Sequence, residues 1–181
     1  MTRPRAPAAG SGRRVSICAG TLIHTRHGRV PVEFVQAGDF VLGQSEAGGE
    51  LAYRRVAHAN ARSRKDLLFV HYLLANEELA RTLVVTASLP FWVRDVGWRP
   101  AEDLRVGCEL QLLEDVEAHV TGIAPVLDAG LPESSARADE EARATRVFNL
   151  EVEDCQSCFV GEAGVWVQNE KPASHPGTSG R

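Results

Sequence analysis

From Ser16 onward, the chain is built of short runs of hydrophobic residues that alternate with polar ones. The runs are rich in Val, Leu and Ile and end at Gly, Asp or Asn, a pattern typical of strands joined by turns. No long window keeps apolar residues at a helical period, so the sequence predicts an all-β domain of many short strands. The expected strands are ICAG, TLIHT, DFVLGQ, ELAYRRVAHAN, DLLFVHYLL, RTLVVTA, PFWVR, CELQLL, EAHVTGIAPV, RVFNLEVE, SCFVG and GVWVQ.

The two ends and one internal stretch lack this alternation. Residues 1–15 are mostly Pro, Ala, Gly and Arg, which is typical of a flexible basic arm. Residues 130–145 are Ala-rich, polar and acidic, and are expected to form an exposed inserted loop. Residues 170–181 are polar and contain Pro and Gly, so they are expected to be a flexible tail. The predicted domain therefore spans residues 16–169.

An internal repeat divides this domain into two similar parts. The segments HGRVPVEFVQAGDFVL and VGWRPAEDLRVGCELQL match without a gap at an offset of 69 (97 − 28). Each copy reads as a strand, a glycine turn, a Pro-x-Glu half-turn, a second glycine turn and a strand. The repeat predicts two β-subdomains related by a pseudo-two-fold axis. The matched pairs are Gly28 and Gly97, Pro31 and Pro100, Glu33 and Glu102, Val35 and Leu104, Gly38 and Gly107, and Val41 and Leu110.

Composition narrows the class of protein. With 44% hydrophobic and 24% charged residues, the chain of 181 residues can bury a substantial core. A formal net charge of −4 gives no electrostatic reason to expect nucleic-acid binding. No apolar run has the length of a signal peptide or of a membrane span, about 18 residues, so a cytoplasmic location is the default expectation. Four cysteines are too few for a disulfide scaffold, and reduced thiols are expected.

Three blocks of the sequence resemble Hint domains, the fold shared by inteins, the hedgehog autoprocessing module and bacterial pre-toxin processing domains. These blocks are SICAGTLIHTRHGRVPVEFVQAGDFVLG, TASLPFWVRDVGWRPAEDLRVGCEL and VFNLEVEDCQSCFVGEAGVWVQN. The resemblance covers residues 16–169 and implies a horseshoe-shaped all-β fold with pseudo-two-fold symmetry. It also implies intein-like autoprocessing of the chain's own flanking segments, without a cofactor, at a site that unites both ends of the domain.

The resemblance assigns roles to three residues. Asn169 would cyclise and break its bond to Glu170. The upstream nucleophile of the family lies four residues before a Gly-Thr pair, which is Ser16 here, and it would attack the preceding carbonyl. Cys18 is the alternative nucleophile, because it is a thiol close to the same end. Thr86 would act as an oxyanion or orientation donor.

The sequence departs from the family where proton carriers are expected. Leu89 replaces a histidine of the second block, and Gln156 and Gln168 replace two histidines of the closing block. Leucine and glutamine side chains cannot exchange a proton near pH 7. A positioned proton-transfer group contributes about 10²–10⁴-fold to a reaction rate. Autocleavage, a single-turnover reaction at most, is therefore expected to be impaired or lost. The alternatives are a non-catalytic Hint-fold binding or scaffold module, which the short flanks favour, and a fragment of a larger polymorphic toxin.

Other conspicuous residues have simpler interpretations. Cys155 and Cys158 form a C-x-x-C pattern, but no second cysteine pair has zinc-ligand spacing, so no metal site is expected. Three tryptophans and four histidines occur at strand positions, where packing or a solvated surface explains them. They are Trp92, Trp98 and Trp166, and His24, His58, His71 and His119.

Overall fold

A computed structural model describes residues 15–45, 49–64, 66–114, 116–126 and 145–169. The arm expected at residues 1–15 lies outside these residues except for Val15, and the tail at 170–181 lies wholly outside them. The inserted loop expected at residues 130–145 also lies outside them, except for its last residue, Thr145, which begins a strand.

The described residues form thirteen antiparallel strands and two 3-10 turns, so the predicted all-β class is confirmed. The first part of the chain forms β1 (Ile17–Cys18), β2 (Leu22–Thr25), β3 (Gly28–Pro31), η1 (Val32–Phe34), β4 (Phe40–Gly43) and β5 (Ala52–Arg64). The middle part forms β6 (Leu67–Leu74), β7 (Arg81–Thr86), β8 (Pro90–Val93), β9 (Gly97–Pro100), η2 (Ala101–Asp103) and β10 (Ala118–Pro125). The last part forms β11 (Thr145–Val152), β12 (Ser157–Val160) and β13 (Val165–Gln168).

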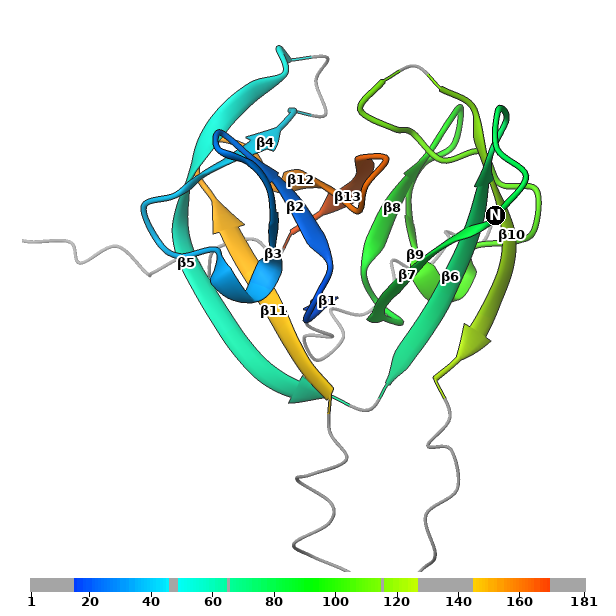
Figure 1. Ribbon diagram of the computed structural model, residues 1–181, viewed down its shortest axis with the longest axis horizontal. Coiled ribbons are helices and arrows are strands. Elements are labelled where there is room, and N and C mark those ends of the chain that lie inside the picture. The colour runs from blue at the N-terminus through cyan, green and yellow to red at the C-terminus, as the bar shows by residue number, and fades with distance from the viewer. Residues whose placement is uncertain (1–14, 46–48, 65, 115, 127–144, 170–181) are drawn as a thin grey trace, which may run out of the picture.

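The strands are arranged in two lobes that lie side by side, as the expected horseshoe requires (Figure 1). The long strand β5 curves along the outer side of one lobe, β10 lies at the outer side of the other with β6 next to it, and the end of β5 approaches the start of β6 at the base. The order in the sheet is β10-β6-β7-β1-β11-β5-β4-β2-β12-β13-β8-β9, with β3 paired to β2. In this order β1 lies between β7 and β11, and β13 lies between β12 and β8.

The backbone confirms the repeat. The hairpin of β2 and β3 leads into η1, and the hairpin of β8 and β9 leads into η2 at the same offset of 69. The paired glycines share a left-handed conformation, with φ of 100° and 92° at Gly28 and Gly97, and 99° and 89° at Gly38 and Gly107. Such φ values favour glycine, which explains why the repeat is most visible at these residues.

The two lobes are joined by strands from both ends of the domain. In β1, Ile17 pairs with Phe148 of β11 on one side and with Val85 of β7 on the other. In β13, Val167 pairs with Phe91 of β8. The junction of the lobes is therefore made by the first and last strands of the domain.

One large hydrophobic cluster runs through both lobes and includes Val32 and Ala101, which follow the two prolines of the repeat. A smaller cluster contains Leu42, Phe159 and Trp166, with Trp92 and Trp98 packed against it, so packing does explain the tryptophans. The strand expected at CELQLL is wrong in one respect. Glu109, Leu110 and Leu112 form isolated bridges to three different partners, and no continuous ladder results.

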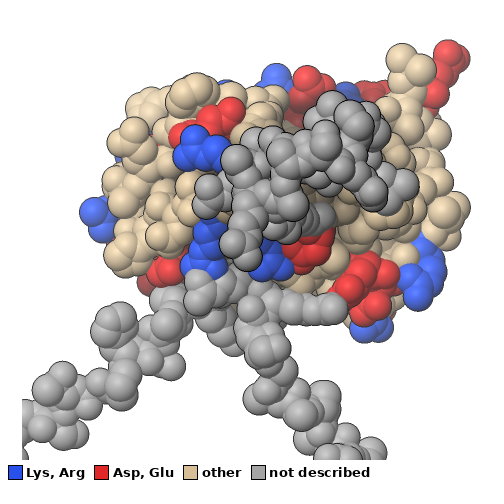
Figure 2. All heavy atoms as spheres, turned by 90° about the horizontal axis from the view of Figure 1, so that it is seen from below, with Lys and Arg blue, Asp and Glu red and all other residues tan. Residues whose placement is uncertain are grey.

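On the face seen in Figure 2, acidic and basic side chains are interspersed over the described surface. Ion pairs on the surface of the domain include Arg55 with Glu153 at 2.9 Å and Arg94 with Glu109 at 3.1 Å. Within the described ranges, no helix is long and apolar enough to span a lipid bilayer.

Candidate active site

Ser16 and Thr86 are held together by three hydrogen bonds. The Ser16 N–H donates to Thr86 Oγ1 at 2.9 Å, and this hydroxyl in turn donates to the Ser16 carbonyl at 3.2 Å. The Thr86 N–H donates to the same carbonyl at 3.1 Å. Both residues are buried. These contacts form because β1 pairs with β7. As a result, the Thr86 hydroxyl is hydrogen-bonded to the nitrogen of the Val15–Ser16 peptide bond.

Leu89 lies in the turn that follows β7. Its N–H donates to the Thr86 carbonyl at 3.0 Å, and its own carbonyl accepts from the Ala101 N–H at 2.8 Å. The side chain is 1% exposed and belongs to the main hydrophobic cluster. The residue three positions after Thr86 is therefore fixed next to the Ser16–Thr86 pair, but it brings a hydrocarbon side chain without a proton to donate.

Asn169 lies at the end of β13 and is 4% exposed. Its N–H donates to the Gln156 carbonyl at 2.7 Å, which extends the β12–β13 ladder by one pair beyond Ser157 and Gln168. Residues opposite each other in an antiparallel ladder project their side chains to the same face. Gln156, which directly precedes β12, is therefore the residue that stands opposite Asn169.

The Asn169 side chain has one polar contact within the described structure. Cys158 Sγ lies 3.4 Å from Asn169 Oδ1. Asn169 Nδ2 is buried and has no hydrogen-bond partner among the described residues. Nearly all buried polar atoms in proteins have a partner, so this nitrogen requires an explanation.

The strand that follows Leu89, β8, pairs with the strand that precedes Asn169, β13. Phe91 pairs with Val167. When this antiparallel register is continued by two residues on each strand, Leu89 stands opposite Asn169. Thr86 is hydrogen-bonded to Ser16 and to Leu89, and the extrapolated register is what would bring Leu89 near Asn169. The direct approach of Ser16 to Asn169 remains a prediction.

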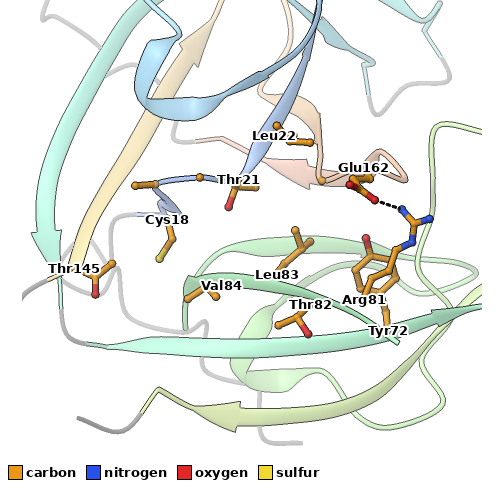
Figure 3. A pocket seen from close by; sticks show the side chains of 13 residues that line it. Cys18, Thr21, Leu22, Tyr72, Arg81, Thr82, Leu83, Val84, Thr145 and Glu162 are labelled. Carbon is orange, nitrogen blue, oxygen red and sulfur yellow. Dashed lines mark hydrogen bonds and ion pairs between the residues drawn. The ribbon is translucent and has the colours of Figure 1, made fainter. Parts of the chain in front are cut away.

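Cys18 lies in a different environment. It lines a cavity of about 650 Å³ between the β1–β2 turn and β7 (Figure 3). An ion pair of Arg81 with Glu162 at 3.2 Å lies at the same cavity. Burial raises the pKa of the Cys18 thiol to about 11, so the thiol stays protonated near neutral pH. A protonated thiol is a poor nucleophile.

The remaining expected residues take ordinary places. His24 shares a hydrogen bond with the Gly161 carbonyl at 2.9 Å, and burial lowers its pKa. His58, His71 and His119 lie in β5, β6 and β10, as strand residues. Cys155 and Cys158 are both free thiols, and the described residues contain no group of three His, Cys, Asp or Glu side chains placed to hold a metal ion.

The contact of Cys158 with Asn169 is the feature that the sequence did not reveal. Residues 158 and 167 pair directly, so Cys158 is a diagonal neighbour of Asn169 on one face of the hairpin. The hairpin register could have indicated this proximity. The register alone does not determine which nearby side chain contacts the Asn169 amide.

Comparison with solved structures supports the same fold. An intein-like bacterial domain from Clostridium thermocellum has a TM-score of 0.69 and 25% sequence identity, and the match covers 87% of this chain and all of that one. The Ssp DnaB mini-intein variant M86 has a TM-score of 0.64 at 17% identity, with 91% of this chain and all of that chain covered. A DnaB intein from Synechocystis sp. PCC 6803 has a TM-score of 0.59 at 17% identity, with 86% and 99% covered. No curated protein sequence matches the chain.

A family model described as the pretoxin Hint domain matches residues 22–170. This range contains Thr86, Leu89, Gln156, Gln168 and Asn169 and begins after Ser16 and Cys18. The matched range is most of the chain, and the fold agrees with it. The chain therefore belongs to the pretoxin Hint domain family.

Proposed function

We propose that this domain is a self-processing module whose substrates are its own flanking segments, and that its cleavage is strongly impaired. The two reactions are an N–O acyl shift at Ser16 and cyclisation of Asn169. Each is a single-turnover event within one chain. Neither step uses a metal or an organic cofactor.

The observation that supports this proposal best is the buried, unpartnered Nδ2 of Asn169. Leaving a buried donor without a partner costs about 1–3 kcal/mol. An unpartnered Nδ2 is explained if this nitrogen must be free to attack the main-chain carbonyl carbon of its own residue. A bond from Nδ2 to that carbon closes a succinimide, and the bond to Glu170 breaks. The proton lost by Nδ2 is balanced by one gained by the departing amino group of Glu170.

At the upstream end, the Ser16 hydroxyl attacks the carbonyl carbon of Val15. An ester to Ser16 Oγ forms, the Val15–Ser16 amide bond breaks, and the freed amino group of Ser16 gains a proton. The Thr86 hydroxyl is hydrogen-bonded to the nitrogen that departs. Its other bond is to the Ser16 carbonyl, not to that of Val15, so the contacts favour an orienting role over an oxyanion role.

Both steps lack a proton carrier at the family positions. Leu89, beside Thr86, cannot donate a proton to the departing Ser16 nitrogen. Gln156, opposite Asn169, and Gln168, the residue before it, can form hydrogen bonds but do not titrate near neutral pH. Because each missing group is worth about 10²–10⁴-fold, the intact chain is the expected form over hours.

The same three residues favour a second candidate, a Hint-fold binding or scaffold module that has lost the chemistry. The family description also fits a third possibility, that the chain is a fragment of a larger polymorphic toxin. The first two possibilities differ in the effect of restoring histidines at the positions of Gln156 and Gln168. A domain with impaired chemistry regains cleavage when proton carriers return, whereas a domain whose backbone has lost the reactive geometry does not.

Intact-mass spectrometry of purified protein at neutral pH and 25 °C tests the proposal. The wild-type chain should remain intact, and the Gln156→His/Gln168→His variant should release the peptide 170–181. The remaining product, residues 1–169, should end in a succinimide, and its mass should be one water lower than that of the same chain with a hydrolysed C-terminus. Adding Asn169→Ala should abolish release and is the matched control. A repaired variant that folds, as judged by circular dichroism, and stays uncleaved would reject the proposal in favour of the scaffold.

A further inference from the structure

The Cys158 side chain makes a polar contact with the Asn169 side-chain amide. It lies in β12, has no exposed surface, and its Sγ is 3.4 Å from Asn169 Oδ1. The distance lies within the range of a hydrogen bond to sulfur. A carbonyl oxygen can only accept, so the thiol is the donor in this contact.

The β12–β13 hairpin creates the contact. Cys158 pairs with Val167, and the ladder continues to Gln156 and Asn169. Side chains of diagonal neighbours on one face of a ladder lie within reach of each other. Gly161 and Gly164, both with positive φ, form the turn that fixes this register. The position of the thiol relative to Asn169 is therefore set by local backbone geometry.

The thiol keeps its proton in the folded protein. Burial raises the pKa of Cys158 to about 12, so the S–H group is intact over the whole neutral range. Cys158 is therefore available as a donor. It does not act as a thiolate base or nucleophile.

We propose that Cys158 is a positioning residue for Asn169 cyclisation, holding Oδ1 through its S–H so that Nδ2 remains on the opposite side of the amide, free for attack. This inference rests on the proposed function and adds a residue to its site. A donor on Oδ1 also withdraws electron density from the amide, which makes the Nδ2 protons more acidic and favours their loss during attack. The structure links the two observations, because the oxygen of this amide has a partner and the nitrogen has none.

A matched pair of variants separates a donor from a packing residue. Cys158→Ser keeps a donor and Cys158→Ala removes it, while both lose the volume of sulfur. In the Gln156→His/Gln168→His background, Cys158→Ala should slow release of the peptide 170–181 about tenfold, the worth of about one hydrogen bond. Cys158→Ser should remain within about threefold of its parent. If Cys158 only filled space, Ser and Ala would serve equally badly, because both are smaller than Cys. Equal loss of the release rate in the two variants would therefore overturn the proposal. A release rate that is equally retained in both would overturn it as well.

The side-chain amide signals of Asn169 give a readout that needs no cleavage. In ¹⁵N–¹H correlation spectra of the otherwise wild-type chain, the pair of signals lost in Asn169→Ala identifies this amide. Cys158→Ala should shift the pair and speed its exchange with water, and Cys158→Ser should largely preserve it. An unchanged pair in Cys158→Ala overturns the positioning role. If the histidine-repaired chain does not cleave, the proposed function fails, and these signals alone decide whether Cys158 fixes Asn169.

Discussion

Thr86 holds both the N–H and the C=O of Ser16 through its side-chain hydroxyl, although 70 residues separate them in sequence. This contact connects the start of the domain to the end of β7. It also orients the peptide bond that the upstream reaction would break. Its energetic importance can be measured without any cleavage.

Replacing Thr86 by Val removes the hydroxyl and keeps the shape. The buried Ser16 N–H then lacks its partner, which should lower the free energy of unfolding by about 1–3 kcal/mol. Thr86→Ser keeps the hydroxyl and should cost less than Thr86→Val. Urea titration followed by tryptophan fluorescence measures both. Equal losses in the two variants would show that the methyl group matters and the hydrogen bonds do not.

The upstream bond should open when a nucleophile and a proton donor are supplied together. Leu89→His places an imidazole in the turn next to Thr86, and Ser16→Cys provides the better nucleophile. Added dithiothreitol should then release the peptide 1–15, detected by intact mass. Leu89→His with Ser16→Ala is the control and should stay intact. Because Leu89 is fully buried, the variants must first be shown to fold, and a folded but inert double variant would contradict the assignment of Ser16.

The two lobes should respond alike to equivalent changes in their glycine turns. Gly38 and Gly107 have φ of 99° and 89°, and a methyl group at either position would meet open space. Gly38→Ala and Gly107→Ala should therefore each cost only the backbone strain, about 1–2 kcal/mol, as measured by urea unfolding.

Gly43→Ala provides the contrast to this pair. A Cβ there would lie 2.6 Å from Cys155 Sγ and 2.8 Å from the Ser157 carbonyl oxygen, so the loss should be larger. Clearly unequal costs at Gly38 and Gly107 would contradict the equivalence of the two turns.

The fold should lose stability in alkaline solution. Burial raises the pKa of Cys18 to about 11 and those of Tyr72 and Cys158 to about 12, against ordinary values of about 8.5 for Cys and 10 for Tyr. Above pH 8.5–10 the unfolded chain loses these protons while the folded chain retains them. The unfolded state then binds fewer protons, so the free energy of unfolding falls as the pH rises from about 9 towards 12.

Tyrosine variants test this pH dependence. Tyr72→Phe should flatten the decline of the unfolding free energy above pH 10, because it removes a group that ionises only in the unfolded chain. Tyr53→Phe is the matched control at an exposed tyrosine and should leave the decline as in the wild type. The measurement is urea unfolding at several pH values between 8 and 11. A stability that does not change with pH in this range would contradict the buried state of these groups.

Sequence reasoning worked best where a residue type is required by the backbone. The glycines and prolines of the repeat predicted a half-turn in each copy, found as η1 and η2, and the equivalence of the lobes. Only a few residue types suit positive φ or the first turn of a helix. The alternation of hydrophobic and polar residues predicted most of the strands, because successive side chains of a strand point to opposite faces of the sheet. It failed at Glu109–Leu112, where successive residues bridge to different strands, and alternation alone cannot distinguish such bridges from a ladder.

The candidate site was predictable only in part. The family pattern named Thr86 and Ser16, and the structure joins them. It could not show that Cys158 contacts the Asn169 amide, since that contact depends on side-chain rotamers across a hairpin. Nor could it show that Cys18 faces a separate cavity, because Ser16 and Cys18 are only two residues apart in the sequence.

The junction of the lobes also has a consequence for timing during synthesis. β1 is made first and β13 last, and at about 5–20 residues per second the interval between them is roughly 8–30 s. Until β13 is complete, β8 is paired only with β9, and the β12–β13 hairpin next to Asn169 has not formed. The surroundings of Asn169 are therefore complete only after the last strand has been translated, so under the proposed function cleavage after Asn169 would follow synthesis of the whole domain.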